Sequence, residues 1–144
     1  MRQIGERGLA LIKRWEGCKL KAYKCPAGVL TVGYGSTGQH VKPGMAITQA
    51  QADKLLRHDL ARFESAVDQL APGASQNEFD AMVSLAFNIG VARFKESTVL
   101  RRHKAGQRQS AAAAFLMWNR AGGQILKGLT NRRTDEAALY LSRP

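Results

Sequence analysis

Apolar residues recur every three or four positions along the first sixteen residues, with Ile4, Leu11 and Trp15 on one side. This spacing predicts an amphipathic helix. We expect the helix to end near Glu16, because the next residue, Gly17, is of a type that commonly terminates helices.

The period of the pattern then changes from helical to extended. Two short apolar runs, 20–23 and 29–32, flank the sequence Cys25-Pro26-Ala27-Gly28, whose proline and glycine suit a turn. The sequence therefore predicts a β-hairpin, followed by a glycine-rich loop over 33–38.

From Thr48 onward the pattern is helical. Thr48 and Gln51 form a capping box, and apolar residues mark one face as far as Leu70, before a Pro-Gly stop. A second capping box, Ser75 with Glu78, opens a helix that is apolar nearly all round. A helix of that kind belongs in the centre of a core.

Gly90 should end this central helix, and shorter helices are predicted at about 97–104, 109–118 and 131–141. The expected fold is α+β, mostly helical, in a single domain over 1–144. A hairpin lobe at about 14–47 would be joined by a linking helix at about 48–71 to a helical lobe at about 74–144. Two such lobes would leave a cleft in which a polymer could lie.

Charge narrows the choice of partners. The 144 residues contain 22 Lys and Arg against 11 Asp and Glu, which gives a net charge of +11 and a pI near 10.3. A field of this sign attracts polyanions such as cell-wall polymer, nucleic acid or anionic lipid. No apolar stretch is long enough to span a bilayer or to act as an export signal.

Cysteine and histidine give no sign of a metal or cofactor. The two cysteines are too few for a disulfide framework and lack zinc-ligand spacing. His40, His58 and His103 are scattered along the chain, and we expect all of them at the surface. The sequence thus predicts neither a metal site nor a cofactor.

Glu16 is the first candidate for chemistry. At the C-terminal end of a helix, the negative end of the helix dipole raises the pKa of a carboxyl group. A general acid needs such a pKa, because it must hold a proton at neutral pH. The alternative is a solvated glutamate paired with Lys13, Arg14 or Lys19, and position alone favours this alternative.

The residues that follow Glu16 favour the catalytic role over the solvated one. Eight residues separate Glu16 from Cys25, five more separate Cys25 from Thr31, and the run Thr31-Val32-Gly33-Tyr34-Gly35 follows. This pattern closely resembles the catalytic region of phage-type lysozymes, glycoside hydrolase family 24. Further similar segments, 87–100, 115–118 and 129–133, extend the resemblance over nearly the whole chain.

The resemblance implies roles for individual residues. Glu16 would protonate the glycosidic oxygen between N-acetylmuramic acid and N-acetylglucosamine, while Cys25 and Thr31 would hold the attacking water, so that the reaction inverts configuration. Phe87 and Asn88 would face the cleft from the helical lobe, with Thr37 and Ser97 as weaker candidates for sugar contacts. Phe87 could equally be a core residue.

The sequence departs from the family's pattern at two positions. Cys25 stands where most members have aspartate, and an unperturbed thiol is mostly protonated at neutral pH. Lys19, Lys21 and Lys24 could lower its pKa. Ser36 stands where many members have a histidine, and we expect this change to affect stability rather than activity.

The resemblance to this family also implies where the enzyme would act. The enzyme would be a monomeric endolysin that waits in the host cytoplasm, reaches the periplasm once a holin permeabilises the membrane, and cuts peptidoglycan there. Nucleic acid is not expected as a specific ligand, since no aromatic–basic ladder is present.

Three other functions remain open at this point. A lytic transglycosylase would break the same bond, and a cysteine hydrolase using Cys25 would cut the peptide stems instead. A non-catalytic module could bind wall polymer or nucleic acid through a cluster of basic residues: Arg101, Arg102, His103, Lys104 and Arg108.

Overall fold

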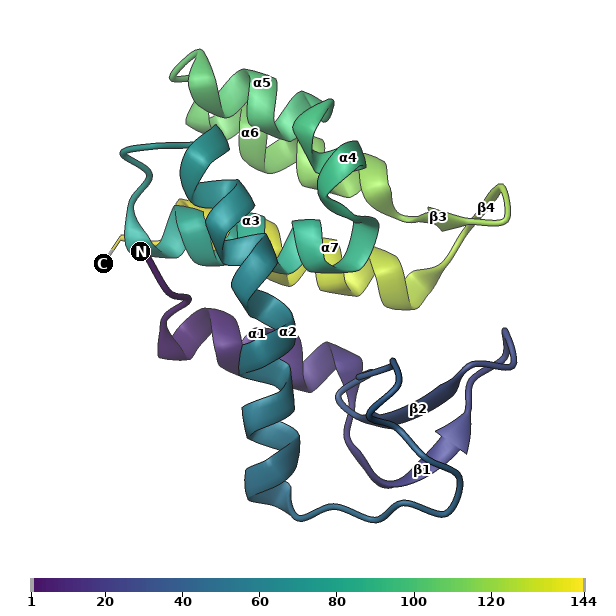
Figure 1. Ribbon diagram of the computed structural model, residues 1–144. Helices are drawn as coiled ribbons and strands as arrows, with labels where there is room; N and C mark the ends of the chain where they lie inside the picture. The colour runs from purple at the N-terminus through teal and green to yellow at the C-terminus, as the bar shows by residue number, and fades with distance from the viewer. Residues whose placement is uncertain (1, 144) are drawn as a thin grey trace. The chain divides into compact units, whose positions relative to one another are not determined.

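The computed structural model describes residues 2–143 and confirms the α+β, mostly helical class (Figure 1). In chain order the elements are α1 (Glu6–Glu16), β1 (Lys19–Lys24), β2 (Leu30–Gly33), α2 (Gln49–Leu70), α3 (Gln76–Ile89), α4 (Val91–Lys95), α5 (Thr98–Lys104), α6 (Arg108–Ala114), the 3-10 helix η1 (Phe115–Trp118), β3 (Arg120–Ala121), β4 (Gln124–Ile125) and α7 (Lys127–Leu141).

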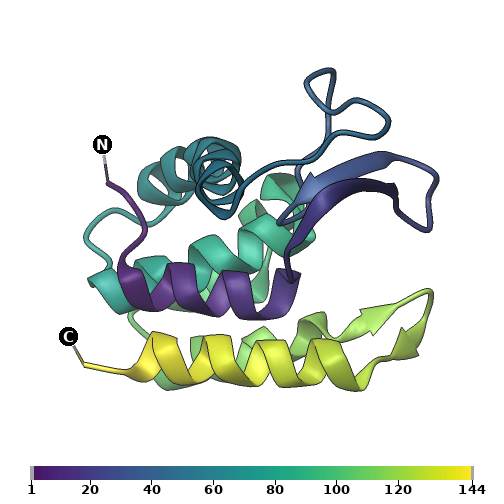
Figure 2. The same ribbon diagram turned by 90° about the horizontal axis from the view of Figure 1, so that it is seen from below.

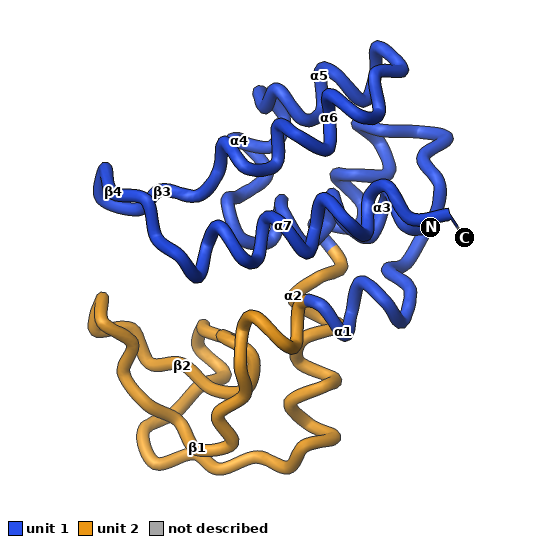
Figure 3. The backbone as a smooth tube through the Cα atoms, turned by 180° about the vertical axis from the view of Figure 1, so that it is seen from behind, with its two compact units in different colours: residues 1–11, 62–144 blue, residues 12–61 orange. Residues whose placement is uncertain are grey.

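The contacts group the chain into two compact units (Figure 3). Unit 1 comprises residues 1–11 and 62–144, and unit 2 comprises residues 12–61. The helices α1 and α2 each contribute to both units. The expected hairpin lobe at 14–47 falls within unit 2, and the expected helical lobe at 74–144 falls within unit 1.

Both predicted capping boxes are present. Gln51 Oε1 accepts from the Thr48 amide at 2.8 Å, and Thr48 Oγ1 accepts from the Gln51 amide at 3.1 Å. The same reciprocal pair joins Ser75 and Glu78 at the start of α3, and Gly90 caps its end. Local side-chain chemistry therefore fixes where these two helices begin.

Helix α3 forms the centre of unit 1. Every residue from Asn77 to Ala86 is buried, and the side chains of Met82 and Leu85 are fully inaccessible to solvent. Helix α7 packs along it, and α5 packs against α6. The prediction of a central apolar helix is confirmed.

A buried carboxylate of α3 holds the start of α1. Asp80 is 1% exposed, and its two oxygens accept from the amides of Gly5 at 3.0 Å and Gly8 at 3.3 Å. The Ile4 amide donates to Glu64 at 2.6 Å. Negative groups stabilise the positive end of a helix dipole, so these contacts fix the helix that carries Glu16 at its other end.

A group of ionic side chains lies in the interior of unit 1. Glu136 is fully buried and lies 2.6 Å from the Nε of Arg133, which is also fully buried. Arg132 donates to the same carboxylate at 3.3 Å, and the Ser84 hydroxyl donates to it as well. Burial raises the pKa of Glu136, and the two arginines oppose that rise.

Some local structure differs from the prediction. Helix α7 begins at Lys127 rather than near Asn131. Its first turn was not predicted, because it contains Gly128 and has no side-chain cap. The five-residue helix α4 and the hairpin β3–β4 were not predicted, since these elements are too short to show a period. Figure 2 shows β3–β4 as a small ribbon leading into α7.

His103 also differs: the expectation that it lies at the surface is wrong. It is 7% exposed, and its Nδ1 lies 2.6 Å from the Tyr140 hydroxyl. Its ring also packs edge-on against that of Tyr140, and a contact between residues so far apart in the chain does not show in a search for metal-ligand spacing. None of the helices in residues 2–143 has the length and apolar character needed to cross a membrane.

Candidate active site

Glu16 is the last residue of α1, as predicted, and its side chain is half-buried. The Gly17 amide closes the helix on the Lys13 carbonyl at 3.2 Å. Gly17 has a φ of 69°, which turns the chain into β1 and which a residue with a Cβ would adopt only with strain. The helix end therefore gives the carboxylate a defined position.

The glycine-rich loop passes close to this carboxylate. Glu16 Oε1 lies 3.7 Å from the point where a Cβ on Gly35 would stand, and Gly35 has a φ of 88°. The preceding residue, Tyr34, is buried, and its hydroxyl accepts a hydrogen bond from Gln49 at 2.9 Å. The loop is thus anchored at Tyr34 and leaves backbone without a side chain beside Glu16.

Lys13, one turn before Glu16, forms an ion pair with Asp53 at 3.1 Å. Its ammonium also lies 5.7 Å from the centre of the Tyr34 ring. Asp53 accepts from Gln49 at 3.0 Å. This network joins α1, the loop and α2 within unit 2, and the sequence analysis did not find it because spacing does not reveal contacts between distant segments.

Cys25 and Thr31 are brought together by the β1–β2 hairpin, visible as a twisted ribbon in Figure 2. The strands pair antiparallel with Lys24 opposite Leu30, and the Cys25 amide donates to the Val29 carbonyl at 2.9 Å. Thr31 is 4% exposed and donates to the same carbonyl at 2.9 Å. Its hydroxyl also interacts with the Cys25 thiol.

The pKa of the Cys25 thiol is lowered from its ordinary value. The largest cause is a hydrogen bond from the backbone at Val29, followed by one at Ala27, with a smaller contribution from Thr31. Hydrogen bonds to a thiolate favour the charged form. The cause is therefore the turn geometry rather than the neighbouring lysines that the sequence suggested.

The second cysteine and Ser36 have separate contacts. Cys18 and Cys25 are both free thiols, and Cys18 Sγ lies 4.0 Å from Gln49 Oε1. Ser36 is 2% exposed, exchanges both backbone hydrogen bonds with Val32, and places its hydroxyl 3.0 Å from His40 Nε2. Ser36 thus has a structural role in the turn that follows β2, and the effect of this substitution on stability stays a prediction.

The predicted sugar-contact residues are divided between the units. Thr37 is exposed on the loop of unit 2, while Phe87, Asn88 and Ser97 belong to unit 1. Phe87 is half-buried and packs edge-on against Phe63, with ring centres 5.2 Å apart. Asn88 is exposed, whereas Ser97 is buried and caps α5 by accepting from the Leu100 amide.

Comparison with known proteins places this arrangement in a family. The model of the phage lysozyme family matches residues 13–136. The chain belongs to the phage lysozyme family. The resemblance drawn from Glu16, Cys25 and Thr31 is thereby confirmed at the level of the family.

This phage lysozyme family member has relatives along its whole length. It is 43% identical to the endolysin of Salmonella phage P22, over 99% of this chain and 100% of the relative. It is also 43% identical to the endolysin of Bacillus phage PZA, over 97% of this chain but only 55% of the relative. The chain thus spans about half the length of that relative.

Solved structures confirm the lysozyme-like fold. The muramidase domain of SpmX from Asticaccaulis excentricus matches with a TM-score of 0.92 at 38% identity, covering 99% of this chain and 100% of that one. A mutant of P22 lysozyme matches with a TM-score of 0.91 at 43% identity, over the same shares.

Proposed function

We propose that this chain is an endolysin muramidase, which hydrolyses the β-1,4 bond between N-acetylmuramic acid and N-acetylglucosamine in peptidoglycan and so lyses the host cell. The main observation in support is the half-buried carboxylate of Glu16, which is fixed at a helix end beside Gly35. The Cys25–Thr31 pair lies in the same unit. Relatives named as endolysins and a neighbour named as a muramidase support the assignment.

In this proposal Glu16 is the general acid. It transfers its proton to the glycosidic oxygen as the bond to the sugar breaks, which makes that oxygen a better leaving group. Because Gly35 carries no side chain, the loop leaves room beside the carboxylate for the departing sugar. The proposed reaction consumes this proton and a water molecule.

Cys25 and Thr31 would orient that water on the opposite face of the sugar. The one hydrogen of the Thr31 hydroxyl can serve either the Val29 carbonyl or the Cys25 sulfur, so that its lone pairs remain available to the water. Attack from the face opposite the leaving group inverts the configuration. Cys25 forms no covalent bond to the sugar in this scheme.

The remaining assignments extend the same proposal. Thr37, Phe87 and Asn88 would contact sugar, whereas the capping role of Ser97 explains its burial without one. The protein would act as a monomer and would pass from the host cytoplasm to the periplasm after a holin opens the membrane. The polymer it meets there is peptidoglycan.

Mass spectrometry of the products of purified peptidoglycan tests the reaction. Hydrolysis should release fragments with reducing N-acetylmuramic acid ends. A transglycosylase would yield 1,6-anhydro ends, each lighter by one water, and a cysteine hydrolase would release free amines. Either of those products would refute the proposal.

A matched pair of variants tests the acid. Glu16→Gln keeps the shape of the side chain but removes its acidic proton, and product release should fall to background. Glu6→Gln makes the same change on the same helix at an exposed position, and its activity should equal that of the wild type. If binding to the wall survives while neither protein releases products, the chain is a binding module instead.

A further inference from the structure

Unit 1 contains a cavity of about 350 Å³ with basic side chains around it. It opens between the turn after α2 and the turn between α5 and α6. Its lining is Ala71, Pro72, Gly73, His103, Lys104, Gly106 and Arg108. Gly73 and Gly106 have φ angles of 82° and 77°, and no heavy atom lies within 4 Å of where their Cβ atoms would stand, so both turns leave the cavity open.

His103 is one of the residues that line this cavity. Its Nδ1 faces the Tyr140 hydroxyl, and burial raises the pKa of Tyr140 to about 12, so that this group stays a phenol. Burial also lowers the pKa of His103, which favours the neutral imidazole. When the phenol donates to Nδ1, the ring proton sits on Nε2, which becomes a hydrogen-bond donor for a ligand.

Arg108 adds a positive group that is held in place. Its Nε donates to Glu78, whose other oxygen accepts from the Ser75 amide. Glu78 is thus satisfied by its own partners. The Arg108 side chain remains 52% exposed, and its terminal amino groups are available to an anion.

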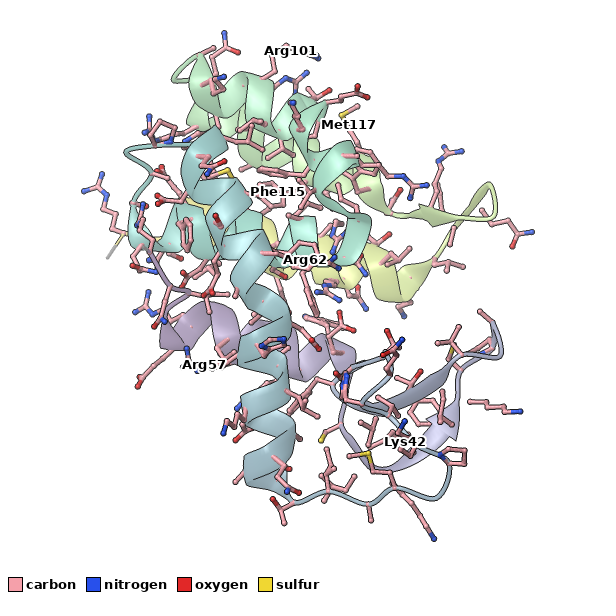
Figure 4. All side chains as sticks on the ribbon, viewed as in Figure 1. Lys42, Arg57, Arg62, Arg101, Phe115 and Met117 are labelled. Carbon is pink, nitrogen blue, oxygen red and sulfur yellow. The ribbon has the colours of Figure 1, made fainter. Side chains whose placement is uncertain are left out.

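Lys104 extends the basic surface to a second cavity. This cavity, of about 320 Å³, is lined by Lys95, Glu96, Ser97, Leu100, Arg101 and Lys104. Lys104 therefore borders both cavities, and within residues 2–143 its ammonium makes no ion pair. Arg101 extends from the outer side of α5 (Figure 4).

We propose that these two cavities, which share Lys104, bind phosphates of a linear phosphodiester polymer of the cell envelope, of the poly(glycerol phosphate) type. Guanidinium, ammonium and imidazole N–H groups together supply the donors that phosphate oxygens require. Two recesses that share one lysine suit a chain with repeated charges better than a single anion. The choice of a cell-envelope polymer rests on the proposed function, although the two cavities would bind the polymer whether or not the chain cleaves peptidoglycan.

Two other polyanions fit the lining less well. Neither cavity is lined by Phe, Tyr or Trp, the side chains on which the bases of single-stranded nucleic acid stack. A membrane surface would favour exposed large apolar side chains near the cations. Those of the described residues in unit 1 are Leu116, Met117, Ile125, Leu126 and Leu141, and none of them lines either cavity.

Titration calorimetry with synthetic poly(glycerol phosphate) of defined length tests the proposal. The test variant combines Lys104→Gln with Arg101→Gln, which leaves the buried contacts of His103 and Arg108 intact. The control combines Lys42→Gln with Arg57→Gln, two exposed residues of unit 2 that are labelled in Figure 4. Each variant removes two positive charges, so the overall field changes equally.

The affinity of the test variant should fall about tenfold or more, and that of the control by less than about twofold. The backbone amide resonances of Gly73 and Gly106 should shift on titration of the wild type. Hydrolysis of peptidoglycan stripped of phosphate polymer should be the same in both variants.

Equal losses in the two variants would mean that only net charge matters and would overturn the site. The absence of wild-type binding, or glycine resonances that do not move, would do the same. If a single-stranded oligonucleotide or an anionic phospholipid vesicle binds more tightly and responds more strongly to the test variant, the assignment of the polymer is wrong.

Discussion

Gly8→Ala should destabilise the protein, although the same substitution within a helix ordinarily stabilises. Alanine gains about 0.5–1 kcal/mol over glycine in a helix interior. At Gly8, however, an added Cβ would lie 2.5 Å from the Asp80 Cβ and 2.7 Å from the Ile4 Cγ1. Carbon atoms pack favourably at about 3.5–4.0 Å, so one partner would have to move by roughly 1 Å.

That movement has a cost which the structure lets us bound. Asp80 belongs to the fully buried stretch of α3, and overpacking in such a core costs about 1–3 kcal/mol. Displacing its carboxylate also weakens the hydrogen bonds to Gly5 and Gly8, each worth about 1.5–3 kcal/mol because the acceptor is charged. After the gain in helix propensity is subtracted, we expect a net loss of roughly 2–4 kcal/mol.

Urea unfolding followed by circular dichroism measures this loss. Gly128→Ala is the matched control, because Gly128 lies in α7 with no heavy atom within 4 Å of its Cβ position. The control should be neutral or more stable by up to about 1 kcal/mol. Should Gly8→Ala also stabilise, the close packing of α1 on Asp80 would be wrong.

Other substitutions test the core and the candidate site. Met82→Ala and Leu85→Ala should each lower the free energy of unfolding by about 2–5 kcal/mol, and losses well under 1 kcal/mol at both would contradict their burial. Glu16→Gln should unfold at the same urea concentration as the wild type or a slightly higher one, whereas an early transition would show that loss of lysis reflects misfolding. Cys25→Asp should retain much of the lytic activity while Cys25→Ala loses most of it, and a fully active Ala variant would remove the water-orienting role. Because the pKa of Cys25 is lowered, its alkylation by iodoacetamide should reach half its maximal rate at a lower pH than the alkylation of free cysteine does. Cys25→Ala retains Cys18, so the difference between the two proteins gives the rate at Cys25. If the half-maximal pH equals that of free cysteine, the hydrogen bonding at the turn would be refuted.

The sequence predicted those elements whose ends are set by local chemistry. Thr48 with Gln51 and Ser75 with Glu78 cap their helices through neighbouring side chains, so their positions can be read directly. The same is true of the hairpin that brings Cys25 to Thr31, since a turn and two short runs determine it.

What the sequence did not reveal depends on contacts between distant segments. The ion pair of Lys13 with Asp53 and the burial of His103 against Tyr140 each join residues far apart in the chain. A polar residue in a sequence pattern is ordinarily assigned to the surface. The burial of such a residue can be predicted only when the position of its hydrogen-bonding or ionic partner is known.

The buried carboxylate of Glu136 has a consequence for how this protein can change over generations. Replacing Glu136 alone leaves two buried arginines without their shared carboxylate, at a cost of about 3–5 kcal/mol, whereas replacing the whole group by apolar residues is often neutral or stabilising. Two tolerable sequences are therefore separated by intermediates that do not fold well. Mutation proceeds mostly one codon at a time, so Glu136 and its arginine partners tend to be retained because the intermediates are unstable, and not because the ionic group itself adds stability.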